Sequence, residues 1–131
     1  MAELVVETLR SGWITTGPKT KENEKQITGY CGNKSTLCVN AATNGLKLVL
    51  RWLGVGEGDE VIVPAYTYCA TVNVVEHCGA KPVFVDIGAD FNISVENIRK
   101  AITPKTKVVM PVDFAGFTCD YDEINDLLFW A

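Results

Sequence analysis

Short apolar runs alternate with segments of helical periodicity along most of this chain. Four runs are predicted as strands, at residues 36–39, 61–63, 81–86 and 107–112, and helical spacing follows each of them, at residues 44–53, 67–77, 94–102 and 121–129. The strands are apolar throughout rather than at every second position, which is typical of parallel strands buried on both faces. The pattern therefore predicts an α/β fold, a three-layer α-β-α arrangement around a mostly parallel sheet.

The first part of the chain lacks this alternation. Residues 2–9 and 21–31 favour helices, and "GWITTGP" at residues 12–18 favours an extended arm. We therefore expect N-terminal helices and an arm at residues 1–32, and a partial α/β domain at residues 33–131. A chain of 131 residues is long enough to bury a core of its own.

Composition and charge exclude several classes of function. With 47% hydrophobic and 21% charged residues, the chain has the composition of a globular protein, and its net charge of −4 provides no basic face for nucleic acid. No apolar run approaches the roughly 20 residues that cross a bilayer. The start "MAELVVETLRSG" carries acids where a signal peptide carries bases, so we expect a cytoplasmic protein without a membrane partner.

The cysteines give no sign of a metal centre. There are five, none in a C-x-x-C pair, and the chain has a single histidine, His77. Zinc sites in proteins use closely spaced cysteines and histidines. We therefore expect reduced thiols and no metal site.

Ligands of open parallel sheets bind beyond the carboxyl ends of the strands. In this sequence those ends are residues 40–43, 64–68, 86 and 113–116. Two of these segments carry side chains that suit a bound ligand.

The first is the strand-to-helix corner in "CVNAATNGLKLVL", residues 38–50. A helix that begins near Thr43 offers unpaired N–H groups and the positive end of its dipole, and Ala41 and Ala42 are small enough for an anion to approach. A tight turn capped by Thr43 explains the same residues. The corner lacks the glycine patterns of phosphate loops and dinucleotide folds, so both interpretations stay open here.

The second is "VPAYTYCAT", which carries Tyr66 and Tyr68 two residues apart after a predicted strand. In an extended stretch the two rings would point the same way, and an aromatic ring at a strand end can stack on a flat ligand. Core or interface packing is the alternative for each tyrosine.

Several blocks together resemble one family. They are "SGWITTGP", the long stretch from "VNAATNG" to "KPVFVDI", "AITPKTKVVMPVDFAG" and "CDYDEI", and they run in order from about residue 11 to about residue 124. These blocks resemble the N-terminal part of the DegT/StrS-type sugar aminotransferases, which depend on pyridoxal 5'-phosphate (PLP). The resemblance implies part of the large domain of the fold-type I PLP-dependent transferases for residues 33–131.

The resemblance also implies roles for particular residues. In the family, the corner after the first strand holds the phosphate of the cofactor, which falls here on Ala42, Thr43 and the backbone of Asn44. The second aromatic of the "P-x-x-T-[FWY]" block stacks on the pyridine ring, and that position is Tyr68. The "T-x-G-P" arm, which Thr16, Gly17 and Pro18 match, lies near the active site of the dimer in the family, so a homo-oligomer is expected.

Other positions depart from the family pattern. The family's "PVH" histidine is Asp113 here, and a family proline is Thr118. The family aspartate that pairs with the pyridinium nitrogen and the lysine that forms the Schiff base have no match among these 131 residues. We therefore expect no catalytic residue in this chain and no transamination by it alone. The strands that neighbour the first strand in the family are also unmatched, so residues 36–39 should lack partners.

Three hypotheses follow. The leading one is a portion of a PLP-dependent aminotransferase that, when complete, moves an amino group from glutamate to a nucleotide-linked keto sugar. The second is a non-catalytic α/β remnant that self-associates through unpaired strands. The third, an unrelated Rossmann-like nucleotide-binding domain, lacks the glycine fingerprint.

Overall fold

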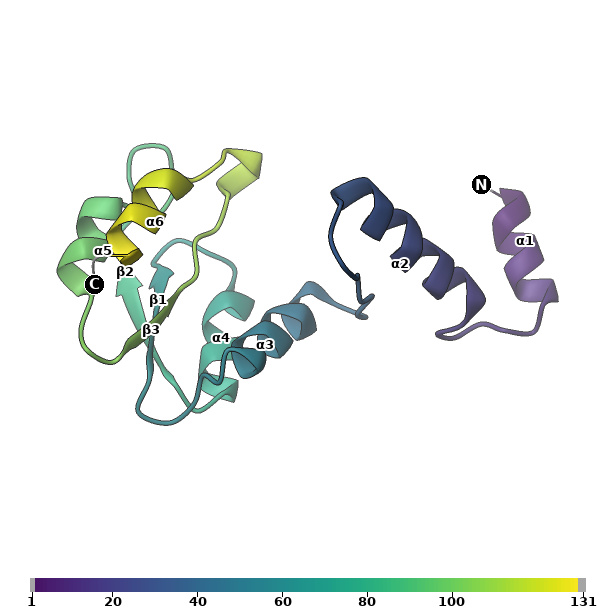
Figure 1. The fold of residues 1–131 in the computed structure, drawn as a ribbon, viewed down its shortest axis with the longest axis horizontal. Helices are drawn as coiled ribbons and strands as arrows, with labels where there is room; N and C mark the ends of the chain where they lie inside the picture. Colours follow the sequence, from purple (N-terminus) through teal and green to yellow (C-terminus); the bar gives the residue numbers. More distant parts are fainter. Residues whose placement is uncertain (1, 130–131) are drawn as a thin grey trace. The chain divides into compact units, whose positions relative to one another are not determined.

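A computed structural model describes residues 2–129 of the chain (Figure 1). The chain divides into two compact units, Met1–Asn40 and Ala41–Ala131, which are described separately below. The predicted division at residue 32 stays a prediction. The outer ends of the two predicted domains, residue 1 and residues 130–131, lie outside the described residues.

The first unit contains two helices, α1 (Ala2–Arg10) and α2 (Pro18–Cys31). Proline at the first position of α2 costs no hydrogen bond, because the first N–H groups of a helix have no partner within it. Helix α2 therefore starts three residues earlier than the polar pattern predicts. It ends at Cys31, and the following Gly32 has a φ of 66°, the left-handed conformation that glycine adopts without strain.

The predicted strand at residues 36–39 is wrong, because this stretch belongs to no strand or helix. Its polar groups bind side chains of α2 instead: the Cys38 N–H donates to Glu24 Oε1 at 2.8 Å, and Thr28 Oγ1 donates to Thr36 Oγ1 at 2.8 Å. A strand requires a neighbour for its backbone groups. The missing neighbours that the family resemblance implies explain why an apolar, strand-like sequence forms no ladder here.

The second unit follows the predicted alternation from its first helix onward. Its elements are α3 (Ala42–Trp52), β1 (Glu60–Pro64), α4 (Cys69–His77), β2 (Lys81–Val85), α5 (Val95–Ala101), β3 (Thr106–Val109), a short 3-10 turn at Phe114–Gly116, and α6 (Tyr121–Phe129). Ser94 caps α5, since its Oγ accepts from the Asn97 N–H.

The three strands form one parallel sheet in the order β2-β1-β3. Central Ile62 pairs with Val83 on one side and Val109 on the other. The carboxyl ends of all three strands therefore meet at one edge of the sheet.

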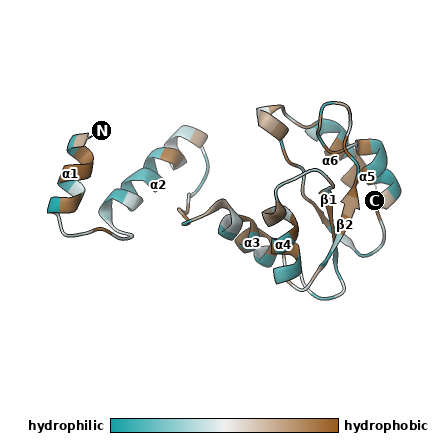
Figure 2. Ribbon diagram, turned by 180° about the vertical axis from the view of Figure 1, so that it is seen from behind, coloured by the Kyte–Doolittle hydropathy of each residue, from teal (hydrophilic) through white to brown (hydrophobic). Residues whose placement is uncertain are grey.

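Helices cover both faces of this sheet, which confirms the predicted three-layer arrangement (Figure 1). On one face the buried side chains come from β1, α3, α4 and the connecting loops, namely Leu50, Val55, Val61, Val63, Val74, Val75 and Ala80. On the other face they come from β1, β2, α5, α6 and the connecting loops, namely Ile62, Val85, Ile93, Ile98, Cys119, Ile124 and Leu127. Figure 2 shows the apolar strands between these helices.

A polar network joins the elements at the amino ends of the strands. The largely buried Glu60 accepts from Lys81 Nζ at 3.0 Å and from Thr103 Oγ1 at 2.7 Å. These bonds, with Thr103 first, lower the pKa of the Glu60 carboxyl below its usual range. The network ties β1 to β2 and to the segment before β3.

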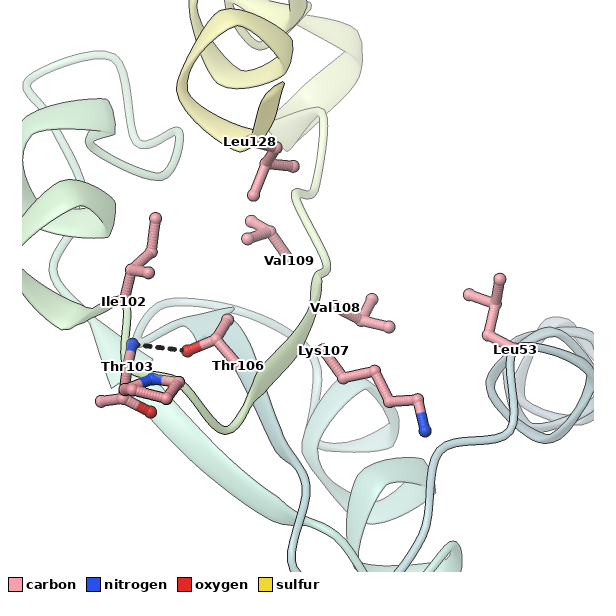
Figure 3. A pocket seen from close by; sticks show the side chains of 9 residues that line it. Leu53, Ile102, Thr103, Thr106, Lys107, Val108, Val109 and Leu128 are labelled. Atoms are coloured by element: carbon pink, nitrogen blue, oxygen red, sulfur yellow. Dashed lines mark hydrogen bonds between the residues drawn. The ribbon is translucent and has the colours of Figure 1, made fainter. Parts of the chain in front are cut away.

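Strand β3 has β1 on one side and no further strand among the described residues. A groove of about 440 Å³ lies along it (Figure 3), between Leu53 after α3 and Leu128 on α6. Figure 3 shows Val108, Val109 and the Lys107 side chain beside this groove.

Within residues 2–129, none of the helices combines the length and apolar character that crossing a membrane requires.

Candidate functional site

A cavity of about 410 Å³ lies at the carboxyl ends of β1 and β3. Two segments far apart in the sequence form its walls, Tyr66, Thr67 and Tyr68 after β1 and Val112, Asp113, Phe114 and Ala115 after β3. Parallel strands bring these segments together because their carboxyl ends share one edge. The site is therefore where the alternating pattern predicts a ligand.

Tyr68 and Tyr66 both line this cavity, but their environments differ. Tyr68 stands at the N-cap position of α4, and it is 78% exposed. Tyr66 packs into an aromatic cluster, with its ring centroid 5.8 Å from that of Phe91 and 5.2 Å from that of Phe114. The sequence left both packing and ligand stacking open for each tyrosine. In the structure Tyr66 packs against other aromatic rings, whereas the Tyr68 ring remains accessible to a ligand.

Asp113 stands at the end of the loop that follows β3, where its carboxylate holds the start of α6. Its Oδ1 accepts from the Cys119 N–H at 2.9 Å and from the Tyr121 hydroxyl at 3.0 Å. The histidine-to-aspartate difference from the family pattern thus places a structural anchor at the cavity wall.

The same contacts shift three pKa values. The Cys119 N–H, and then the Tyr121 hydroxyl, lower the pKa of the Asp113 carboxyl, so this group stays charged at neutral pH. Burial, followed by the neighbouring carboxylate, raises the pKa of the Cys119 thiol and of the Tyr121 hydroxyl. The cavity wall therefore carries one negative charge, with both neighbours neutral.

The corner at Ala42, Thr43 and Asn44 forms the first turn of α3, after an extended Ala41. The Asn44 N–H and the Gly45 N–H both bond the Ala41 carbonyl, at 3.1 and 3.3 Å. The N-cap residue, Ala41, makes no side-chain cap hydrogen bond, and among the described residues the Thr43 hydroxyl has no hydrogen-bond partner. The predicted cap by Thr43 is therefore not formed, and its hydroxyl remains available as a donor.

The structure does not place all the predicted site residues in one cavity. Tyr68 lines the cavity, whereas Ala42, Thr43 and Asn44 are not among its lining residues. Nor does any lysine line it.

Three residues at this edge escaped prediction from the sequence. Phe91 and Phe114 build the aromatic cluster, and Asn92, only 3% exposed, joins two loops beneath it. An asparagine in "FNIS" carries no signal of its own, because its partners lie 22 and 25 residues further along the chain.

No group of three or more His, Cys, Asp or Glu side chains is arranged to hold a metal ion in the part of the chain that the structure describes.

Comparison with known families decides the identity of this scaffold. The family described as DegT/DnrJ/EryC1/StrS aminotransferases matches residues 1–128. The chain belongs to this family. The resemblance of the sequence blocks is thereby confirmed.

Curated relatives within the DegT/DnrJ/EryC1/StrS family include named aminotransferases. The chain is 48% identical to UDP-4-amino-4-deoxy-L-arabinose--oxoglutarate aminotransferase of Shewanella sediminis. The alignment spans 124 residues, which are 94% of this chain and 32% of the relative. The chain is also 45% identical to the spore coat polysaccharide biosynthesis protein SpsC of Bacillus subtilis. This alignment spans 121 residues, which are 92% of the chain and 31% of the relative. The chain thus spans about a third of the length of the curated relatives it matches.

Solved structures of family members share the fold. The PLP form of the sugar aminotransferase candidate Spr1654 from Streptococcus pneumoniae matches at 56% identity with a TM-score of 0.89, over 94% of this chain and 32% of that one. NtdA from Bacillus subtilis with bound cofactor PMP matches at 33% identity with a TM-score of 0.92, over 98% of this chain and 30% of that one. The scaffold described above is therefore part of a fold that holds PLP or PMP in these relatives.

Proposed function

We propose that the chain is part of a PLP-dependent aminotransferase whose complete form transfers an amino group, from glutamate, to a nucleotide-linked keto sugar. The observation that carries this proposal is the exposed ring of Tyr68 at the cavity where the strands end, in a chain of the DegT/DnrJ/EryC1/StrS family. The named relatives support the substrate class, and the family resemblance supports a cytoplasmic location.

The residues of the chain suit the parts of PLP that need binding rather than chemistry. The first turn of α3 begins with the N–H groups of Ala42 and Thr43, which precede the two N–H groups bonded to the Ala41 carbonyl. Together with small alanines and a Thr43 hydroxyl without a partner among the described residues, this end of the helix suits a phosphate. Tyr68 offers an accessible ring face for a pyridine. Ala42, Thr43, Asn44 and Tyr68 are the residues that we propose hold the cofactor.

The same chain does not supply the covalent chemistry. PLP acts as an electron sink once a lysine amine carries it and an acidic partner keeps its ring nitrogen protonated. None of the residues that line the Tyr68 cavity is a lysine. We therefore propose that these 131 residues do not catalyse transamination by themselves.

Titration with PLP, followed by absorption and circular dichroism, tests the proposed cofactor site. Wild-type chain is expected to induce a dichroic band in the PLP absorption. Thr43→Ala and Tyr68→Ala should each weaken binding about tenfold, since each removes one hydrogen bond or one stacking surface. Thr43→Ser and Tyr68→Phe, which keep the hydroxyl and the ring, are matched controls and should bind nearly as well as wild type.

Borohydride reduction of the same mixture tests the proposed inactivity. Because no lysine lines the cavity, reduction should label no single lysine stoichiometrically. One fully modified lysine would contradict the proposed inactivity, and binding unaffected by both alanine variants would overturn the proposed cofactor site.

The second candidate is self-association, which the open edge of β3 and the groove beside it favour. Light scattering after size exclusion is expected to give a mass above the 14.3 kDa of one chain. Leu128→Glu, in the groove, should lower this mass, whereas Leu48→Glu, on α3 outside the groove, should not. A monomeric wild type at all concentrations would exclude the second candidate and the expected homo-oligomer of this chain.

A further inference from the structure

We propose that Asn92 is a positioning residue of the Tyr68 cavity. Through two side-chain hydrogen bonds it holds the Phe114–Gly116 turn in the conformation that forms the cavity wall, and so it sets the affinity for a planar ring bound there. The statement about affinity rests on the proposed function, whereas the statement about the turn does not.

Asn92 bonds the turn at both of its ends. Its Oδ1 accepts from the Phe114 N–H at 3.0 Å, and its Nδ2 donates to the Phe117 carbonyl at 3.0 Å. An asparagine amide supplies one acceptor oxygen and two donor hydrogens in one plane. Neither an aspartate nor a leucine of similar size makes both bonds.

The position of Asn92 is itself fixed. Its N–H donates to Asp90 Oδ1 at 3.2 Å, its carbonyl accepts from the Gly88 N–H at 2.8 Å, and Ile87 pairs with Ile93 around it. Because the side chain is only 3% exposed, water does not substitute easily for either of its bonds to the turn.

The turn needs such a restraint because part of it is strained. Ala115 has a φ of 53°, a left-handed conformation that alanine adopts at a cost. Gly116, with a φ of 81°, follows it. Bonds on either side of these two residues offset that cost.

The restraint matters to the cavity because the restrained residues are its wall. Phe114 packs against Tyr66 and Phe91, at centroid distances of 5.2 and 5.4 Å, and Phe114 and Ala115 line the cavity that Tyr68 faces from the other side. If the turn relaxes, the part of the wall formed by Phe114 and Ala115 moves, while Tyr68, at the N-cap position of α4, stays in place.

Asn92→Leu, which is close to isosteric and removes both bonds, tests the proposal in the 131-residue chain. Amide exchange at Phe114 should accelerate about tenfold, nuclear Overhauser effects between the Tyr66 and Phe114 rings should weaken, and PLP affinity should fall about tenfold. Thr103→Val is the matched control, because it removes a hydroxyl bond to Glu60 at the other end of the strands. It should change none of these readings.

The readouts separate this proposal from the proposed cofactor site. If wild-type chain binds no PLP, the cofactor site fails, and the ring contact alone decides the role of Asn92. An unchanged Tyr66–Phe114 contact in Asn92→Leu would overturn the proposal. So would an unchanged PLP affinity in a variant that has lost the contact.

Asn92→Asp decides the matter if the leucine variant does not fold. It keeps an acceptor for the Phe114 N–H and loses the donor to the Phe117 carbonyl. The Tyr66–Phe114 contact should therefore persist while amide exchange around Phe117 accelerates. Loss of the ring contact in this variant would show that the Oδ1 bond does not hold Phe114.

Discussion

Ile62→Ala is expected to lower the free energy of unfolding by about 2–5 kcal/mol. Ile62 is fully buried on the central strand, in the core cluster that also contains Ile98 and Leu127. Truncation removes three carbons there and leaves a cavity that the flanking strands prevent from closing. Because domains of this size are stable by roughly 5–15 kcal/mol, the variant would lose a large part of its stability.

Urea titration of wild type and variants measures this loss. The midpoint should fall while the slope stays constant, since the folded and unfolded states keep their accessible surface. Ile62→Val should cost only about 0.5–1.5 kcal/mol. Leu48→Ala, at a side chain 50% exposed on α3, is the control with little effect. Equal costs for Ile62→Ala and Leu48→Ala would mean that the core on this face is absent in solution.

The same position shows why the sheet was predictable. Ile62 and Val63 point to opposite faces, as consecutive strand residues do, and both are fully buried. A strand that is apolar on both faces has to be covered by other elements on both faces. The three-layer arrangement therefore follows from this short strand together with the segments of helical periodicity on either side of it.

The failure at residues 36–39 has the opposite origin. Those residues are apolar enough for a strand, yet pairing depends on a neighbour from elsewhere in the chain. Local sequence contains no information on whether that neighbour is present. Glu24 and Thr28 of α2 bind this stretch instead.

Element ends were less predictable than elements. Helix α4 begins at Cys69 rather than Thr67, since Tyr68 is extended with a ψ of 140°. The Thr67 and Thr71 hydroxyls lie 2.8 Å apart across the start of this helix, a tertiary detail that periodicity does not contain. This shift is what leaves the Tyr68 ring exposed at the cavity.

The candidate site was predictable in its place but not in its walls. Strand ends located Tyr68 and Asp113, because parallel topology alone brings them to one edge. Phe114 and Asn92 became part of the site only through contacts between loops. The left-handed conformation at Ala115 was not predictable either, because the residue there is not a glycine. The roles of Ala42, Thr43 and Asn44 stay a prediction.

Val75→Asp is expected to prevent the second unit from folding at neutral pH. Val75 is fully buried on α4, within the apolar core cluster on the other face of the sheet, so a carboxylate there is placed among the side chains of that cluster. An unpaired buried charge costs several kcal/mol on top of the lost packing, which is comparable to the whole stability of a domain. Since α4 begins beside Tyr68, the variant should also lose the cavity and any PLP binding.

Asn73→Asp is the matched control, because it places the same carboxylate on an exposed position of the same helix. Far-UV and near-UV circular dichroism should match wild type for Asn73→Asp and show unfolding for Val75→Asp. Burial raises the pKa of a carboxyl, so the penalty on Val75→Asp should shrink as the pH falls toward the ordinary value of about 3.9, where the unfolded chain also binds the proton. At each pH the comparison is with Asn73→Asp, because acid also protonates Glu60 and Asp113, whose lowered pKa values stabilise the wild-type fold at neutral pH. A native spectrum for Val75→Asp at neutral pH would mean that α4 does not pack on the sheet, and Tyr68 would then have no fixed position from which to bind a ring.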